Sequence, residues 1–265
     1  VWIKKKEIEQ LSEFVKGYSS GEELDIRVNK EGSFNILKND IYALVNTKNE
    51  QIKAVETERD SLSDYMADIS HQMKTPLTSI SLLLNLLQEE HLSEKKRLQY
   101  VQDLMKLTGR IDWMVYALLR LAKLDAGTVQ LQQVPYQIED LIKAAVTPLE
   151  IALDIRDITL EVQMQPDLQH RGDISWMTEA VSNILKNCME HTPSGGHIRI
   201  VTKDNPLYLL IKITDSGRGF TKQDLPHIFE RFYRGQNADT DSVGIGLALA
   251  KRIIIAQNGT IRAYN

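Results

Sequence analysis

Apolar residues recur at steps of three, four and seven positions through a long and highly charged part of this chain. The stripe runs through Ile41, Val45, Ile52, Val55, Leu62, Met66 and Ile69, and continues into Met73, Ile80, Leu83 and Leu87. Such spacing is that of a heptad repeat, which predicts a long helix that pairs along one narrow seam. We therefore expect a dimeric coiled coil. A long helix packed on a globular core is the alternative.

A second long helix is indicated between residues 95 and 124. Ser93 is a favourable N-cap residue, and the run Asp125-Ala126-Gly127 ends the helix. The connection between the two helices, around residues 89–93, is short and polar, which predicts an antiparallel hairpin. Two hairpins from two copies of the chain would form a four-helix bundle, so we expect a homodimer.

After Gly127 the pattern changes to short strands that alternate with helices. Strand-like runs occupy residues 128–133, 158–163, 197–203 and 208–214, and helical stretches occupy residues 138–152, 174–191 and 247–257. This mixture predicts a separate α+β domain. We thus expect a linker over residues 1–62, a helical hairpin domain over residues 63–127 and an α+β domain over residues 128–265.

The composition excludes some classes of function. The net charge is -4, from 36 acidic and 32 basic residues. We therefore expect no nucleic-acid partner, since such proteins normally carry a basic surplus. The single cysteine fits a reducing compartment. No apolar run is long enough for a membrane span, but Trp2 followed by Lys4, Lys5 and Lys6 is typical of the cytoplasmic end of one.

His71 lies inside the first long helix and is followed closely by a proline. Pro76 offers no N–H to the carbonyl of Gln72 and clashes with it, so a kink is expected about one turn after His71. A helix interior normally avoids this residue, at a cost of about 3 kcal/mol. The irregularity suggests a functional histidine, against the alternative of an ordinary solvated side chain.

The residues from His71 to Leu77 resemble the phosphoacceptor box of two-component sensor histidine kinases. The resemblance implies that His71 attacks the γ-phosphate of ATP through Nε2. It also implies that Thr75 positions water when the response regulator is dephosphorylated. Gln72 stands where the family usually has an acid, and its carbonyl can still fix the histidine tautomer but cannot take a proton. We expect His71 to be phosphorylated nonetheless, at a reduced rate.

Asn183 and Asn187 are four residues apart and share one helical face, with Lys186 beside them. Amide groups there can coordinate a hard cation and donate hydrogen bonds to phosphates. Residues 183–193 resemble the N box of the same family, in which Asn187 would bind Mg²⁺.

Two residues of this segment depart from the family pattern. Glu190 stands where a lysine is usual, and His191 stands where a tyrosine is common. A glutamate beside the phosphates is repulsive unless a cation screens it. We consider Glu190 a candidate base toward His71, and His191 a side chain that can stack on the nucleotide.

Further segments resemble the other boxes of the ATP-binding domain. Asp215 ends an expected strand and would receive the adenine amino group, with Gly217 and Gly219 allowing a close approach of the backbone. In the F box, Phe229 would anchor a mobile lid at residues 236–242, and Arg231 or Arg234 would reach phosphate. In the G2 box, Gly244, Gly246 and Leu247 open a helix whose N–H groups favour phosphate. A Rossmann fingerprint is the competing interpretation, but no strand precedes this segment.

The order of these segments implies the cytoplasmic portion of a bacterial membrane-anchored histidine kinase. ATP and Mg²⁺ would be bound, and a response-regulator receiver domain would be the partner. Residues 1–62 would be a juxtamembrane linker, with a HAMP-like relay as one interpretation, and family members usually continue beyond the last residues seen in this chain. The alternatives are another ATPase of the chaperone or topoisomerase kind, and a catalytically silent scaffold that relays conformation.

Overall fold

The computed structural model describes residues 9, 33–89, 91–205, 207–235 and 243–265. The chain forms two compact units, Val1–Ile69 and Ser70–Asn265. The pattern at Trp2 to Lys6, residues 1–8 and 10–32 of the expected relay, and the lid at residues 236–242 lie outside the described residues. No helix of the described ranges is both long enough and apolar enough to cross a membrane.

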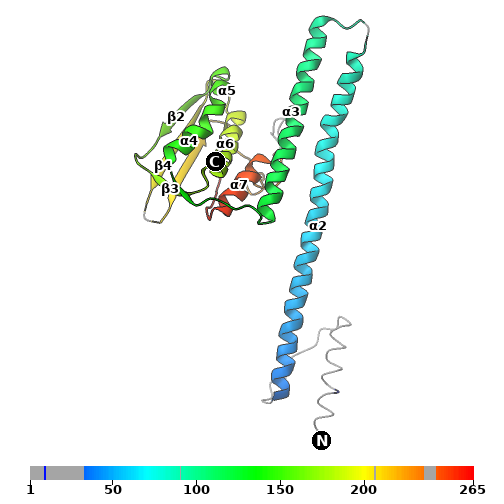
Figure 1. The fold of residues 1–265 in the computed structure, drawn as a ribbon, viewed down its shortest axis with the longest axis vertical. Coiled ribbons are helices and arrows are strands. Elements are labelled where there is room, and N and C mark those ends of the chain that lie inside the picture. The colour runs from blue at the N-terminus through cyan, green and yellow to red at the C-terminus, as the bar shows by residue number, and fades with distance from the viewer. Residues whose placement is uncertain (1–8, 10–32, 90, 206, 236–242) are drawn as a thin grey trace. The chain divides into compact units, whose positions relative to one another are not determined.

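The first long helix, α2 (Ser33–Leu87), carries the heptad stripe through both units as one element (Figure 1). In the first unit the side chains of Leu44, Ile52 and Val55 are all more than half exposed. The helix is not ended by Pro76, although the carbonyl of Gln72 loses its helical donor there. Hydroxyl groups bond to the backbone around it, and Thr75 Oγ1 donates to the carbonyl of His71 at 3.3 Å.

The second long helix, α3 (Glu94–Asp125), has the predicted ends. Ser93 is its N-cap, and the Ser93 side chain accepts a hydrogen bond from the backbone N–H of Lys96 at 3.4 Å. Gly127 follows the helix with a φ of 62°, the left-handed conformation in which glycine ends helices at low cost. The predicted helical hairpin is confirmed.

The C-terminal α+β domain is built from short elements. They are β1 (Val134–Gln137), α4 (Ile138–Val146), η1 (Thr147–Leu149), α5 (Glu150–Ile155), β2 (Thr159–Gln163), β3 (Gln169–Gly172), α6 (Ile174–His191), β4 (His197–Asp204), β5 (Leu209–Asp215) and α7 (Gly246–Ala256). The main sheet has the order β2-β4-β5, with β2 parallel and β5 antiparallel to β4. Strands β1 and β3 form a separate antiparallel pair.

Helices α4 and α6 cover one face of the main sheet (Figure 1). Alternate residues of β4, Ile198, Ile200 and Thr202, are buried, as expected for a strand with one covered face. The register places Ile198 opposite Asp215, so that β5 ends beside the edge of the core. The predicted α+β domain is confirmed.

Two local predictions are wrong. Residues 128–133 form no strand, and the pairing begins instead at Val134. The helix expected over residues 138–152 is broken by a 3-10 turn that contains Pro148. Proline lacks the N–H that would continue the α-helical hydrogen bonding, so a new short helix starts after it.

Candidate functional site

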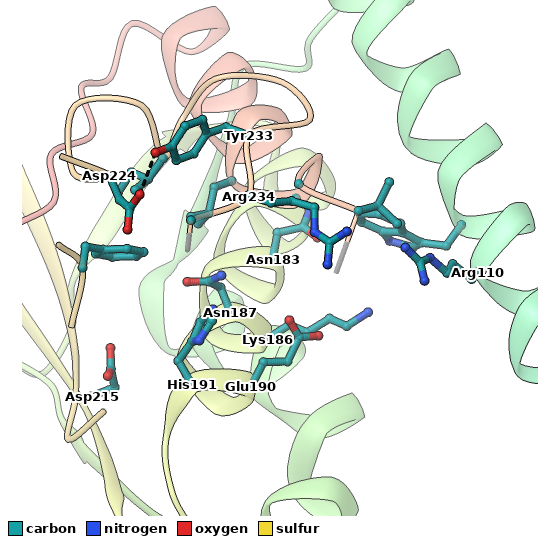
Figure 2. A pocket seen from close by; sticks show the side chains of 18 of the residues that line it. Arg110, Asn183, Lys186, Asn187, Glu190, His191, Asp215, Asp224, Tyr233 and Arg234 are labelled. Atoms are coloured by element: carbon teal, nitrogen blue, oxygen red, sulfur yellow. Dashed lines mark hydrogen bonds between the residues drawn. The ribbon is translucent and has the colours of Figure 1, made fainter. Parts of the chain in front are cut away.

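A cavity of about 720 Å³ opens where α6, the end of β5 and the start of α7 meet (Figure 2). Most of the predicted nucleotide-binding residues line it. They are Asn183, Lys186, Asn187, His191, Asp215, Gly219, Arg234, Gly244, Gly246 and Leu247, and the candidate base Glu190 lies among them. Segments that are far apart along the chain therefore converge on one site.

Helix α6 supplies one wall of the cavity and is fixed at its start by Asp173. The buried Asp173 carboxylate accepts hydrogen bonds from the backbone N–H groups of Ser175 and Trp176, at 3.1 and 3.2 Å. Asn183 and Asn187 follow on the cavity side of this helix, and Asn183 is only 9% exposed. Figure 2 shows Lys186 and Glu190 side by side below them. One helix therefore holds together two side-chain amides, the ammonium group of Lys186 and the carboxylate of Glu190.

The far end of the cavity is formed by Asp215 and the turn that follows it. Asp215 Oδ1 accepts a hydrogen bond from the backbone N–H of Gly217 at 2.9 Å. A Cβ atom at Gly217 would lie 2.6 Å from the carbonyl oxygen of His191, so no larger residue fits there. Gly217 is not itself one of the lining residues, and its function is to let the turn approach α6.

Cys188 lies on α6 behind this end of the cavity and is buried. Burial raises the pKa of the Cys188 thiol strongly, and the charge and hydrogen bond of Asp215 raise it further. A thiol in this state is poorly nucleophilic, because the thiolate is the reactive form. Cys188 is thus a packing residue that touches the Asp215 carboxylate.

The start of α7 closes the cavity on another side. Gly244 has a φ of 75°, and a Cβ atom there would lie 2.6 Å from the carbonyl oxygen of Tyr233. The backbone N–H of Phe232 donates to the carbonyl of Gly244 at 2.9 Å, which joins the two chain segments. Helix α7 begins at Gly246, and the exposed N–H groups of a helix start favour an anion.

Asp224 and Tyr233 also line the cavity, and neither was expected to belong to the site. The Tyr233 hydroxyl donates to Asp224 Oδ1 at 2.7 Å, and Asp224 is 5% exposed. The hydrogen bond to Asp224 raises the pKa of Tyr233, so the phenol stays protonated. Tyr233 is part of the F-box segment, but nothing in the sequence marks Asp224 as its partner.

Some predicted site residues lie away from the cavity. His71, Gln72 and Thr75 are on α2, and none of them is a lining residue. His71 and Thr75 are exposed. Phe229 does not line the cavity either, and the Lys251 ammonium lies 5.7 Å from the centre of its ring.

Arg231 is also absent from the cavity wall, so of the two arginines expected as candidates to reach phosphate, Arg234 is the one that lines the cavity. Its guanidinium pairs with the carboxylate of Asp125 at the end of α3. Arg252 of α7 pairs with the same carboxylate. The ionic attraction of Asp125 therefore holds Arg231 at the contact with α3, while Arg234 faces the cavity.

The described residues contain no cluster of three or more His, Cys, Asp or Glu side chains that could hold a metal alone. The side chains of Asn183, Asn187 and Glu190 offer oxygen atoms within the cavity wall. Mg²⁺ is commonly bound by one or two protein oxygens together with phosphates of the substrate. The donor set fits a magnesium ion that arrives with a nucleotide.

Two family models match the chain. The one described as the His Kinase A (phospho-acceptor) domain matches residues 61–127. The one described as the histidine kinase-, DNA gyrase B- and HSP90-like ATPase matches residues 172–265.

Curated sensor proteins of bacteria are similar over most of this chain. Sensor protein SphS of Synechococcus elongatus is 31% identical over 237 residues, which cover 82% of this chain and 56% of the relative. Heme sensor protein HssS of Staphylococcus saprophyticus is 29% identical over 202 residues, which cover 76% of this chain and 43% of the relative. The chain spans about half the length of the curated relatives it matches.

Solved structures of histidine kinases share the fold. AdeS of Acinetobacter baumannii has a TM-score of 0.59 at 20% identity, over 74% of this chain and 91% of that one. Histidine kinase ThkA in complex with response regulator protein TrrA has a TM-score of 0.61 at 18% identity, over 76% of this chain and 57% of that one. The arrangement of a helical hairpin followed by this α+β domain is therefore a known one.

Proposed function

Because this chain belongs to the bacterial two-component sensor histidine kinases, we propose that it is an ATP-dependent autokinase whose acceptor is His71. The observation that carries the proposal is the convergence of Asn187, Asp215 and Gly246 on one cavity, in a chain that also presents an exposed histidine on a helical hairpin. The matched region covers about half of the length of the relatives. The activity of the whole protein is therefore inferred from the phosphoacceptor domain and the ATPase domain.

ATP would lie in the cavity with its adenine toward Asp215 and its phosphates toward the start of α7. The Asp215 carboxylate can accept a hydrogen bond from the adenine amino group while it also holds the Gly217 N–H. His191 lines the wall between and offers a ring for stacking. Asn183, Lys186 and Arg234 line the opposite part of the cavity and would contact the phosphates.

Asn187 would hold Mg²⁺ through its amide oxygen, with Asn183 and Glu190 close by on the same helix. A bound magnesium ion would neutralise part of the negative charge of the phosphates. It also accounts for Glu190 at this position, because a cation lowers the repulsion between a carboxylate and the phosphates.

The transfer needs positioning more than covalent help from the protein. The lone pair of His71 Nε2 attacks the γ-phosphorus as the bond to the bridging oxygen of ADP breaks. The imidazole then carries a positive charge, with its Nδ1 proton facing a hydrogen-bond acceptor. The carbonyl of Gln72 can accept that bond but cannot neutralise the charge. Glu190 is the other candidate for this task, and an unimpaired Glu190→Gln enzyme would remove it from consideration.

The phosphoryl group would pass from His71 to an aspartate of a response-regulator receiver domain. The structure of ThkA, a histidine kinase of similar fold, in complex with response regulator protein TrrA supports a partner of this kind. Thr75 lies one turn after His71, is exposed, and donates its hydroxyl to the His71 carbonyl. We propose that rotation of this hydroxyl lets it orient the water that dephosphorylates the regulator. A homodimer and a membrane anchor upstream of Val1 belong to the same proposal.

Two other functions remain as rivals. The matched ATPase family also includes DNA gyrase B-like and HSP90-like proteins. The phosphoacceptor-domain match over residues 61–127 favours a kinase over these. A silent scaffold is the second rival, and Gln72 and Glu190 are the departures that favour it.

The test is incubation of the whole chain with Mg²⁺ and ATP labelled at the γ-phosphate. Wild type is expected to gain acid-labile label, and His71→Ala to gain none while it still binds ATP. His91→Ala is the matched control, since His91 is another exposed histidine of the hairpin, and it should label normally. Label that persists in His71→Ala would sink the assignment. A wild type that binds ATP but takes up no label, even with a receiver domain present, would favour the scaffold.

A further inference from the structure

The nucleotide cavity is not made by the α+β domain alone, because one face of α3 forms part of its wall. Asp103, Lys106, Arg110 and Trp113 follow each other at steps of three and four residues and all line the cavity. This spacing places them on one side of the helix. Ser79 of α2 lines the cavity as well, about two helical turns after His71. Both helices of the phosphoacceptor hairpin thus border the proposed ATP site.

Packing in the next turn of α3 fixes this face against the α+β domain. Met114, one turn after Arg110, is fully buried in a cluster with Leu249 and Ile253 of α7. Ala117 and Leu121 continue the same buried stripe of α3. Close packing in such a cluster leaves little room for side chains to move, so it fixes which face of α3 is turned toward the α+β domain.

Polar contacts on either side of the buried stripe hold the same orientation. The Lys186 ammonium lies 5.3 Å from the centre of the Trp113 ring, which links α6 to the cavity face of α3. Further along, the Arg120 guanidinium lies 4.1 Å from the centre of the Trp176 ring. At the end of α3, Asp125 pairs with Arg231 and Arg252. The position of Arg110 therefore follows from contacts at several levels of the helix.

Arg110 lies at the phosphate end of the cavity. Figure 2 shows its guanidinium group on the same side as Arg234 and Asn183, at the end away from Asp215. If Asp215 receives the adenine, the triphosphate extends toward Arg110. A guanidinium group suits phosphate because it offers several N–H donors in a fixed plane and keeps its charge at all relevant pH values.

We propose that Arg110 is a phosphate-binding residue that α3 supplies to the ATP site, so that the terminal phosphate of ATP bridges the two domains. The assignment rests on the proposed function, since it extends the same nucleotide site. ADP lacks the phosphate that Arg110 reaches. ATP should consequently favour the contact between α3 and the α+β domain more than ADP does, because coupling between two binding events is reciprocal.

The test compares the affinities of the whole chain for ATP and ADP, each with Mg²⁺, by titration calorimetry. Arg110→Gln is expected to weaken ATP binding about tenfold, equivalent to about 1.4 kcal/mol, and to change ADP binding much less. Arg110→Lys keeps the charge and should retain part of the preference for ATP. Arg97→Gln is the matched control, because Arg97 is an exposed arginine of α3 outside the cavity, and it should behave as wild type.

The outcomes separate this assignment from the function on which it rests. A wild type that binds ATP, with an unchanged ratio of ATP to ADP affinity in Arg110→Gln, would overturn the role of Arg110 alone. An equal loss for both nucleotides would do so too, since it would mean that Arg110 only supports the fold of the cavity. A wild type that binds neither nucleotide would overturn the proposed function itself.

Discussion

Gln72 is the residue next to the proposed acceptor, and its chemistry predicts how fast the acceptor reacts. Gln72→Glu should raise the initial rate of His71 labelling about fivefold, because a hydrogen bond to a charged acceptor exceeds a neutral one by about 1 kcal/mol. Gln72→Met, which has no strong acceptor, should be slower than wild type. The measurement is the initial rate at saturating ATP. A rate in Gln72→Glu that is unchanged or lower would show that Gln72 does not act on the Nδ1 proton.

Tyr136 carries a buried polar atom that the fold does not use. The residue is 8% exposed, and its hydroxyl has no hydrogen-bond partner among the described residues. Leaving such a group unsatisfied costs about 1–3 kcal/mol. Tyr136→Phe should therefore stabilise the domain by about 1 kcal/mol in urea denaturation. Tyr208→Phe is the control, since Tyr208 is 58% exposed and its substitution should change little.

The same residue predicts a loss of stability at alkaline pH. Burial, followed by the charge of Asp173, raises the pKa of Tyr136 to about 12. The unfolded chain releases this proton near pH 10, while the folded chain keeps it, so stability falls as the pH rises from about 10 to 12. The advantage of Tyr136→Phe over wild type should widen across this range. A constant difference in unfolding free energy between pH 9 and 11 would contradict the assigned cause.

The start of α6 depends on one side chain. The Asp173 carboxylate holds the first N–H groups of the helix, and its other oxygen accepts from the backbone N–H of Gln132 at 3.1 Å. Asp173→Ala should cost about 2 kcal/mol of stability, because it removes a cap and leaves buried donors unsatisfied. Ser93→Ala is the matched change at an exposed cap and should cost less than half as much. Equal losses in urea denaturation would show that burial adds nothing to the cap.

The helices and strands also show which sequence signals were sufficient to predict where an element begins and ends. Helix α6 was predicted with its observed ends. Helix α3 was predicted within one residue at each end, because Ser93 and Gly127 act locally on the backbone. Strand β3, with the sequence Gln-His-Arg-Gly, carries no alternation of apolar and polar residues. It is a strand because β1 pairs with it, from Val134 opposite Gly172 onward. Pairing between distant segments of this kind leaves no local pattern.

The residues of the site also fall into two groups: those that a short sequence motif predicts and those that only tertiary packing brings to the cavity. Asn183, Asn187 and Gly244 could be assigned to the cavity because each belongs to a short motif. In each motif the residue spacing or the backbone conformation gives a local physical reason for the assignment. Arg110 and Asp224 reach the cavity only through tertiary packing, and neither stands in a motif. Arg231 was placed with Arg234 because both belong to the segment that resembles the F box. The position of Asp125, more than a hundred residues earlier in the chain, is what separates them.

The hairpin exposes apolar side chains that a second copy of the chain would cover. Leu84 on α2 is 49% exposed, and Leu98 on α3 is 60% exposed. Changing both to Glu should convert the proposed dimer to a single chain of 30.2 kDa in sedimentation experiments, because charges would be buried in the bundle. The control is Ile151→Glu with Ile155→Glu on α5, where both residues are at least 75% exposed. A dimer that survives the hairpin changes would place the interface elsewhere.

The burial of Cys188 has a practical consequence for following this protein in solution. It is the sole thiol of the chain, and its position on the buried side of α6 keeps it protonated. Maleimide reagents require the thiolate and access to it, so the native protein should remain unlabelled near neutral pH. A cysteine introduced on the surface would then carry a fluorophore at a single known position. The chain can accept such a probe without first being stripped of its own cysteine.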